Sequence, residues 1–188
     1  MNREQWLQAA VKKFRPLFAS HDKPVPEKVR VSCGFPSTGG RSARRTTIGE
    51  CWQPGASADS TYEIFISPVV QDAVEVLAIL AHELCHAALP PGVGHRPPFG
   101  KLARAIGLEG KLTATVAGDA FKQWAAPALD KLGPYPHAKL DALRDRKKQS
   151  TRMVKATCAT CGYVARTTRK WINDVGAPHC PAHGEMNV

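Results

Sequence analysis

The sequence lacks any long hydrophobic run. Nowhere in its 188 residues does an apolar stretch approach the roughly 18 residues that a membrane-spanning helix requires. The segment beginning MNREQWLQAA also lacks the continuous apolar region of a secretion signal. We therefore expect a soluble cytoplasmic protein that has no membrane partner.

Acidic side chains are also scarce. The chain has 16 Asp and Glu against 26 Lys and Arg, which gives a formal net charge of +10. Within residues 138 to 188, ten Lys or Arg stand against four Asp or Glu, so the basic excess is concentrated toward the C-terminus. Such an excess favours a polyanionic partner such as nucleic acid.

Cysteines number six, and without an export signal their thiols are expected to stay reduced. A disulfide framework is therefore not expected. Three of the six lie near the C-terminus at metal-binding spacing. We interpret the others, Cys33, Cys51 and Cys85, as thiols of the protein core.

Periodicity of the apolar residues predicts the secondary structure. Helices are expected over residues 2–18, from either Ser67-Pro68 or Asp72 through Leu84, from Pro98 to Ile106, and over 118–131. Pro16 is expected to kink or end the first helix. Strands are expected over 28–33, 47–53 and 61–67, the last two paired across a Pro-Gly-Ala-Ser loop.

A His-Glu-x-x-His pattern lies on the second predicted helix, as His82-Glu83-Leu84-Cys85-His86. Histidines four apart project from one helical face, so both can reach a single zinc ion. Glu83 lies beside them and can accept a proton from a metal-activated water. The pattern predicts a catalytic zinc with Glu83 as general base.

A catalytic zinc needs a third protein ligand. His95 is the first candidate, because a Pro-Pro-Gly-Val-Gly turn before it can bring the chain back toward the motif helix. Glu109 is the alternative, as a carboxylate ligand.

These motifs together resemble the SprT-like (Spartan-like) zinc metalloproteases. The matching segments, in the same order as in the family, are EIFISP at 63–68, HELCHA at 82–87, GHRPPF at 94–99 and KLA at 101–103. The resemblance covers about residues 28 to 110, with a separate match near the C-terminus.

The resemblance implies that His95 is the third zinc ligand and that proteins bound to DNA are the substrates. It also implies a small sheet beside the motif helix. Arg96 and Pro98 depart from the family pattern, which usually has glycine and a polar residue there, so loop flexibility and substrate access are expected to differ.

Near the C-terminus, two paired-ligand knuckles are typical of a structural zinc site. Cys158 and Cys161 form the first, and Cys180 and His183 form the second. His179 is the alternative to His183. A module this small depends on its metal for folding.

Basic and aromatic residues alternate between the two knuckles, on what should be two short strands. Such a surface can bind single-stranded nucleic acid by stacking and charge neutralisation. Alternatively, the aromatic side chains pack the small core and the charges are merely solvated. The residues concerned are Tyr163, Arg166, Arg169, Lys170 and Trp171.

The sequence thus predicts an α+β fold. A zincin-like domain over residues 1–132, with a small antiparallel sheet packed against the motif helix, is followed by a basic linker over 133–152 and a β zinc ribbon over 153–188. We expect a monomeric protease with one catalytic and one structural Zn²⁺ that acts on proteins bound to DNA, and we expect this DNA to be single-stranded. The alternatives are a non-catalytic nucleic-acid-binding or transcription-associated factor, and a hydrolase acting on a non-peptide bond.

Overall fold

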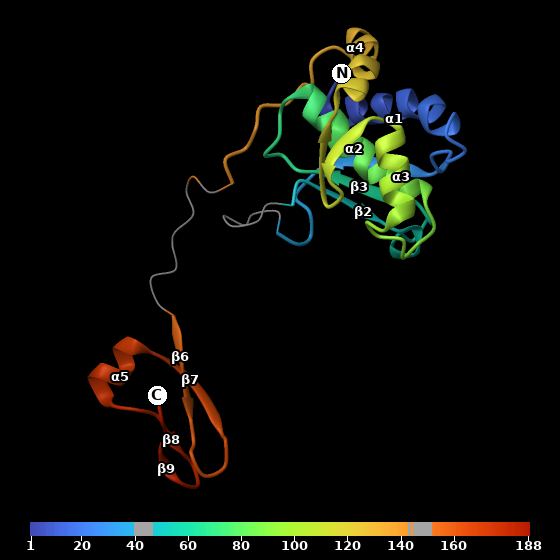
Figure 1. Ribbon diagram of the computed structural model, residues 1–188. Coiled ribbons are helices and arrows are strands. Elements are labelled where there is room, and N and C mark those ends of the chain that lie inside the picture. Colours follow the sequence, from blue (N-terminus) through green and yellow to red (C-terminus); the bar gives the residue numbers. More distant parts are fainter. Residues whose placement is uncertain (40–46, 143, 145–151) are drawn as a thin grey trace. The chain divides into compact units, whose positions relative to one another are not determined.

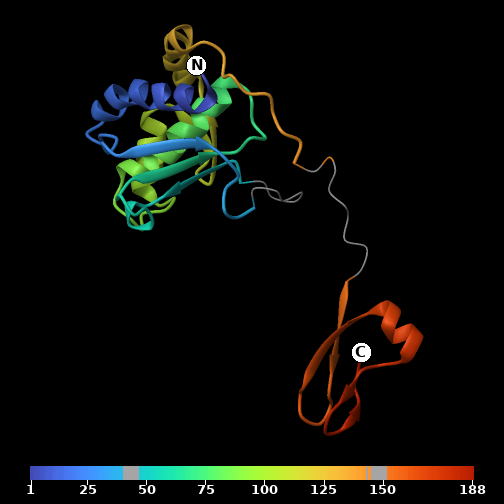
Figure 2. The same ribbon diagram turned by 180° about the vertical axis from the view of Figure 1, so that it is seen from behind.

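A three-stranded sheet with helices packed on one face organises the first part of the chain (Figures 1 and 2). The computed structural model describes residues 1–39, 47–142, 144 and 152–188. These divide into two compact units, Met1–Arg144 and Asp145–Val188. Both units mix helices with short strands, so the fold class is α+β. Among the residues described, no helix is long and apolar enough to cross a membrane.

Helix α1 covers Arg3–Ala19 and buries one apolar face. Its N-terminus is closed by a capping box, in which Asn2 and Gln5 each accept a hydrogen bond from the other's backbone N–H. The predicted kink or end at Pro16 does not stop the helix, which continues to Ala19.

The sheet is mixed, not antiparallel as expected. Strands β1 (Val29–Cys33), β2 (Gly49–Trp52) and β3 (Tyr62–Ile66) lie in the order β1-β3-β2. The predicted pairing of β2 with β3 is confirmed and is antiparallel, but β1 pairs with β3 in parallel. Alternating polarity shows that a strand is half-buried but does not show its direction, so this pairing was not visible in the sequence.

Alternation along the strands separates two faces of the sheet. Val31, Ile64 and Ile66 are buried in the main core with residues of α1 and of helix α2 (Ala73–Ala88). The register pairs Glu50 with Phe65 and Trp52 with Glu63 on the opposite face. A short 3₁₀ turn, Pro54–Ala56, follows β2.

Helix α2 covers Ala73–Ala88 and is mostly buried. It begins at Asp72, whose carboxylate accepts a hydrogen bond from the Glu75 N–H at 2.8 Å. The structure therefore selects the Asp72 start over the Ser67-Pro68 start.

Two more helices complete the first unit, α3 (Pro97–Ala105) and α4 (Asp119–Leu132), close to their predicted positions. Between them lies a hairpin that the sequence analysis did not predict, formed by β4 (Leu108–Lys111) and β5 (Ala114–Ala117). Its four-residue strands are too short for the pattern of apolar residues to mark them clearly.

The segment after α4 packs on the first unit. Tyr135 is buried against Trp6, with ring centroids 5.0 Å apart. His137 Nε2 and the Leu140 N–H both contact the Pro68 carbonyl oxygen, at 2.9 and 2.7 Å. Residues 133–142, expected to belong to the linker, are thus held by the first unit. Of the remaining predicted linker, residues 143 and 145–151 lie outside the described residues.

The C-terminal unit contains β6 (Met153–Thr157), β7 (Val164–Thr168), α5 (Arg169–Val175), β8 (His179–Cys180) and β9 (Gly184–Glu185). Between the knuckles, β7 confirms one of the two predicted strands, while α5 stands in place of the other. Thr168 caps the helix by accepting a hydrogen bond from the Trp171 N–H, and Gly176 closes it with a positive φ of 91°. Arg169, Lys170 and Trp171 therefore lie on a helix.

Gly107 permits a close approach between α3 and α4. Its φ is +86°, and a Cβ atom there would lie 2.5 Å from the Phe121 backbone nitrogen. We expect Gly107→Ala to lower the free energy of unfolding by about 2–4 kcal/mol, because the steric clash adds to the backbone strain. Denaturant unfolding followed by tryptophan fluorescence measures this change.

Gly110→Ala is the matched control. Its φ of +87° is nearly the same, but a Cβ atom would find no neighbour closer than 3.6 Å. We expect this variant to lose only about 1 kcal/mol, from backbone strain alone. Equal losses in the two variants would contradict the close contact with Phe121.

Candidate metal centres

Helix α2 presents two histidines toward one side of the first unit. His82 and His86 lie one turn apart on the half-buried face, while Leu80, Leu84 and Cys85 face the core. The Nδ1 and Nε2 atoms of such a pair can reach one shared point because residues at i and i+4 are neighbours on a helix.

A glycine turn brings the third histidine back to α2. Gly92 and Gly94 take positive φ angles of 82° and 54°, which most other residues avoid. His95 follows directly, and its Nε2 lies 3.1 Å from that of His82 and 3.2 Å from that of His86. The three side chains form a group able to hold a metal ion.

Pro97 and Pro98 then begin α3, at positions where a helix needs no backbone donor. The departures from the family pattern at Arg96 and Pro98 thus lie at the cap and the first turn of a helix.

Glu109, the alternative third ligand, is not part of this group. Its carboxylate lies beside Gly118, where a Cβ atom would be only 2.4 Å from Oε1.

The Phe99 ring packs against the three imidazole rings. It is fully buried, and its ring centroid lies 4.8, 4.5 and 4.9 Å from those of His82, His86 and His95. The ring limits the rotamers that the histidines can adopt, so the group is preorganised.

Thr115, on the unpredicted hairpin, contacts the histidine group directly. Its Oγ1 lies 2.8 Å from His82 Nδ1. When His82 binds a metal through Nε2, Nδ1 carries the proton and donates a hydrogen bond to Thr115 Oγ1. This bond fixes the tautomer and the orientation of the ring. Sequence reasoning missed this residue; the alternating run Thr113-Ala-Thr-Val116 was the available signal.

Burial keeps the histidines neutral. Desolvation, followed by the charges of His86 and His95, lowers the pKa of His82 to about 3. Desolvation and His95 lower the pKa of His86 to about 4, and desolvation also lowers the pKa of His95. Neutral imidazoles keep the lone pairs that a metal ion requires.

Glu83 lies beside the histidines and is only 6% exposed. Its carboxylate packs against Gly49 of β2, where a Cβ atom would lie 2.4 Å from Oε1, so only glycine leaves room for it. Burial, and then the charge of Glu50, raises the pKa of Glu83 to about 8. A cation held by the histidines lowers this pKa and favours the carboxylate.

A cleft of about 660 Å³ opens over the histidines and Glu83. One wall is the segment from Thr47 to Gln53, which includes β2. The other includes Thr113, Ala114 and Thr115 at the turn of the β4–β5 hairpin. The group is thus accessible from solvent on one side.

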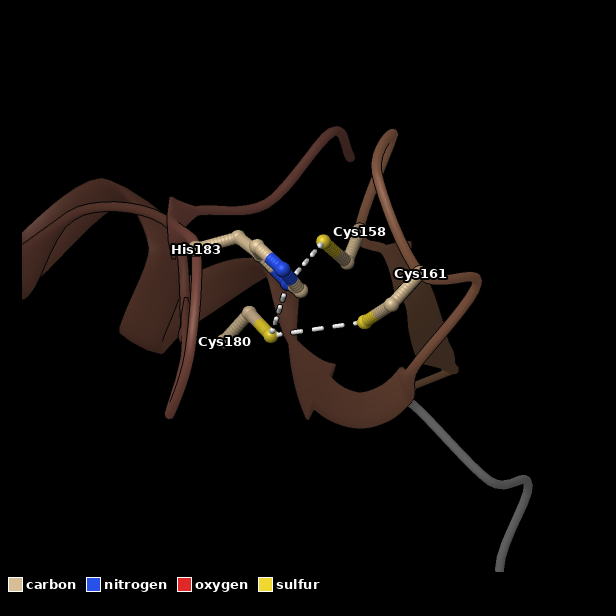
Figure 3. Close-up of side chains that lie close together, drawn as sticks. All are labelled: Cys158, Cys161, Cys180 and His183. Carbon is tan, nitrogen blue, oxygen red and sulfur yellow. Dashed lines mark hydrogen bonds between the residues drawn. The ribbon is translucent and has the colours of Figure 1, made fainter.

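A second group of ligand side chains lies in the C-terminal unit (Figure 3). Cys158 and Cys161 flank the turn between β6 and β7, while Cys180 and His183 flank the turn between β8 and β9. The Cys161 and Cys180 sulfurs are 3.7 Å apart, and His183 Nδ1 lies 3.7 Å from Cys158 Sγ and 3.5 Å from Cys180 Sγ. A tetrahedral ion with metal–sulfur bonds of about 2.3 Å requires edges of about 3.8 Å, so the four atoms fit one.

The structure groups His183, and not His179, with the three cysteines. His179 lies on β8 opposite Glu185 and is exposed.

The remaining cysteines are free thiols. Cys85 is buried in the main core, and Cys33 and Cys51 are half-buried against it. Cys51 also lines the cleft, and burial, followed by the charge of Glu83, raises its pKa to about 12. None of the three forms a disulfide.

The aromatic residues considered for nucleic-acid binding do not pack the small C-terminal core. That core consists of Ala156, Cys158, Cys180 and Met186. Tyr163 is 49% exposed and Trp171 is 53% exposed. Both rings are open to solvent, and Lys170 Nζ lies 5.2 Å from the centre of the Trp171 ring.

No protein-family model, curated protein or solved structure matches this chain. The resemblance to SprT-like proteases therefore stays a prediction.

We expect Thr115→Val to weaken metal binding at the histidine group by about tenfold or more, because His82 loses the acceptor that orients it. Chelator competition on the full chain measures the dissociation constants of both sites. Only the histidine site should change.

Thr115→Ser retains the hydroxyl and should bind metal as the wild type does. Thr113→Val makes the same chemical change two residues away, at an exposed position of the same turn. If Thr113→Val weakened binding as much as Thr115→Val, the hydrogen bond to His82 would not be the cause.

Proposed function

We propose that this chain is a zinc metallopeptidase whose first unit is a zincin-like catalytic domain and whose C-terminal unit is a zinc ribbon that binds nucleic acid. Its substrates are then proteins bound to DNA. The observation that carries the proposal is the convergence of His82, His86 and His95 beside the buried Glu83 in an open cleft.

The donor sets favour zinc at both groups. Three cysteines and one histidine in a closed tetrahedron are typical of structural zinc. Three neutral histidines with an open side are typical of catalytic zinc, and an ion with bonds of about 2.0–2.1 Å requires edges of about 3.4 Å. The separations of 3.1 and 3.2 Å between Nε2 atoms are close to this value.

Zinc held by the three histidines supplies Lewis acidity, which activates water and polarises a carbonyl group. Glu83 then accepts the proton of the attacking water at its carboxylate and delivers it to the leaving amine. Its buried position against Gly49 keeps the carboxylate away from bulk water and fixes its orientation. A purely structural metal site has no need of this residue.

The walls of the cleft favour an extended peptide over a small substrate. Within the described part of the sheet, β2 is an outer strand, and it forms one wall of the cleft. An outer strand offers backbone groups with which a peptide can pair. A peptide paired there passes beside the histidines, which supports peptide-bond hydrolysis.

Metal content and cleavage test the catalytic assignment. We expect wild type to hold two zinc ions per chain, and Glu83→Gln to hold the same two while cleaving a DNA-binding protein at least about 10²-fold more slowly, as the loss of a general base predicts. His95→Ala should lose one zinc ion. Metal analysis of the purified proteins and a gel-based cleavage assay measure both quantities.

Equal cleavage by wild type and Glu83→Gln would contradict the peptidase proposal and favour the alternative, a non-catalytic nucleic-acid-binding protein. If the wild type cleaved only a non-peptide substrate, the alternative of a hydrolase acting on a non-peptide bond would be favoured. Assays with and without single-stranded DNA show whether nucleic acid stimulates the reaction.

The exposed aromatic rings support the nucleic-acid role of the C-terminal unit. Bases stack on open rings such as those of Tyr163 and Trp171, while Arg166, Arg169 and Lys170 can neutralise phosphates. The Lys170 ammonium beside the Trp171 ring places a charge next to a stacking surface. Had the rings packed the core instead, only solvated charges would remain at this surface.

We expect Trp171→Leu to weaken binding of single-stranded DNA by about tenfold, the loss of one stacked base. Arg166→Gln should reduce the slope of log K against log salt by about 0.7, the value for one phosphate contact. Fluorescence anisotropy over a salt series measures both effects.

Val175→Ala is the control, because Val175 is an exposed apolar residue on the same helix. It should bind DNA as the wild type does. Unchanged binding by Trp171→Leu and Arg166→Gln would contradict the proposed surface, and the same series with RNA determines which nucleic acid is preferred.

A further inference from the structure

A second pocket lies on the outer face of the sheet, opposite the helices. Its volume is about 350 Å³. Three aromatic and two acidic residues dominate its lining, which consists of Phe35, Ser37, Glu50, Trp52, Ala56, Glu63 and Phe65. The mechanism proposed above uses none of them.

The strand register assembles this pocket. Glu50 lies opposite Phe65 and Trp52 lies opposite Glu63, so carboxylates and rings alternate on one face. Phe35 and Ser37 come from the segment after β1 and close one side. Trp52 is 41% exposed, so the pocket is open to a ligand.

Glu50 is held rigidly at the pocket wall. Its carboxylate accepts hydrogen bonds from the Ser37 Oγ at 2.6 Å, the Ser37 N–H at 2.8 Å and the Trp52 Nε1 at 2.9 Å. Burial alone would raise the pKa of Glu50, but these hydrogen bonds outweigh it and keep the pKa below its ordinary value. The pocket therefore carries a fixed negative charge.

Beside the pocket, acidic and basic side chains form an ion-paired group. Glu63 is paired with Arg30, which also binds Asp59 at 2.7 Å, so one guanidinium is shared by two carboxylates. The Lys28 ammonium donates a hydrogen bond to the Asp59 backbone oxygen, at 3.2 Å. Of the residues that the structure describes, none of those lining the pocket is a lysine or an arginine.

Strand β2 borders both this pocket and the cleft over the histidines, since Glu50 lines both. Side chains of a paired strand point alternately to the two faces of a sheet. A peptide paired with β2 thus directs some side chains toward the histidines and their neighbours toward the outer face. The pocket lies on that outer face beside β2, since Glu50 and Trp52 of this strand line it.

We propose that this pocket is a substrate subsite that binds a cationic side chain, lysine or arginine, of the peptide in the cleft. Aromatic rings and carboxylates together bind cations by cation–π attraction and ion pairing. The inference rests on the proposed peptidase function. It agrees with substrates that bind DNA, whose nucleic-acid-contacting segments are rich in lysine and arginine.

The net charge of the protein makes this preference diagnostic. At +10, the chain as a whole repels a cationic peptide. A preference for lysine therefore requires a local acidic site.

Peptide binding to the zinc-loaded Glu83→Gln chain tests the subsite without cleavage. The probes are two fluorescent peptides that differ in one residue, lysine or its uncharged analogue norleucine. We expect the lysine peptide to bind about tenfold more tightly, from one cation–π contact and one ion pair. Trp52→Leu and Glu63→Gln, each added to this chain, should reduce the preference severalfold, while Asp130→Asn, an exposed acid on α4, should leave it unchanged.

Equal binding of the two peptides, or binding of neither, would overturn the subsite. So would a lysine preference that survives both Trp52→Leu and Glu63→Gln. Failure of the peptidase proposal is recognised separately: the lysine preference would then be present, but wild type would cleave neither peptide.

Discussion

The cost of burying polar side chains on α2 is the constraint around which the first unit is arranged. His82, Glu83 and His86 lie on a helix that is otherwise packed with aliphatic residues, and unpartnered polar groups in such a place are destabilising. Each neighbour reduces that cost in a specific way. Thr115 Oγ1 forms a hydrogen bond with His82 Nδ1, Gly49 leaves room for the Glu83 carboxylate, and His95 completes a set of ligand atoms that can hold a cation.

These partners come from elements far apart in sequence, so the whole fold is needed to form the site. The sheet contributes Gly49, the turn after α2 contributes His95, and the β4–β5 hairpin contributes Thr115. The C-terminal unit brings its ligands together with much less structure, because they lie in two tight turns that are separated only by β7 and α5. One site depends on long-range packing and the other on local chain geometry.

The features predicted correctly from the sequence are those with a strong local pattern of residues. The histidine and cysteine spacings identified both ligand groups, and apolar periodicity located α1, α2 and α4. Relations that depend on tertiary packing were not visible: the parallel pairing of β1 with β3, the contact of Thr115 with His82, and the space at Gly49. Helix α5 was missed because its seven residues are too few for a periodic pattern, although Thr168 and Gly176 are ordinary cap residues.

Two of the four residues that form the core of the C-terminal unit, Cys158 and Cys180, are also ligand side chains. Its interior and its candidate metal site thus share two side chains. If these side chains hold an ion, the stability of the folded unit depends on the free concentration of that ion, since a ligand that binds only the folded form shifts the folding equilibrium by mass action. Thiol oxidation would act on this unit while sparing the three histidines, which have no thiol among their ligand atoms. An oxidising environment would thereby disable the C-terminal unit while leaving the ligand atoms of the histidine group unchanged.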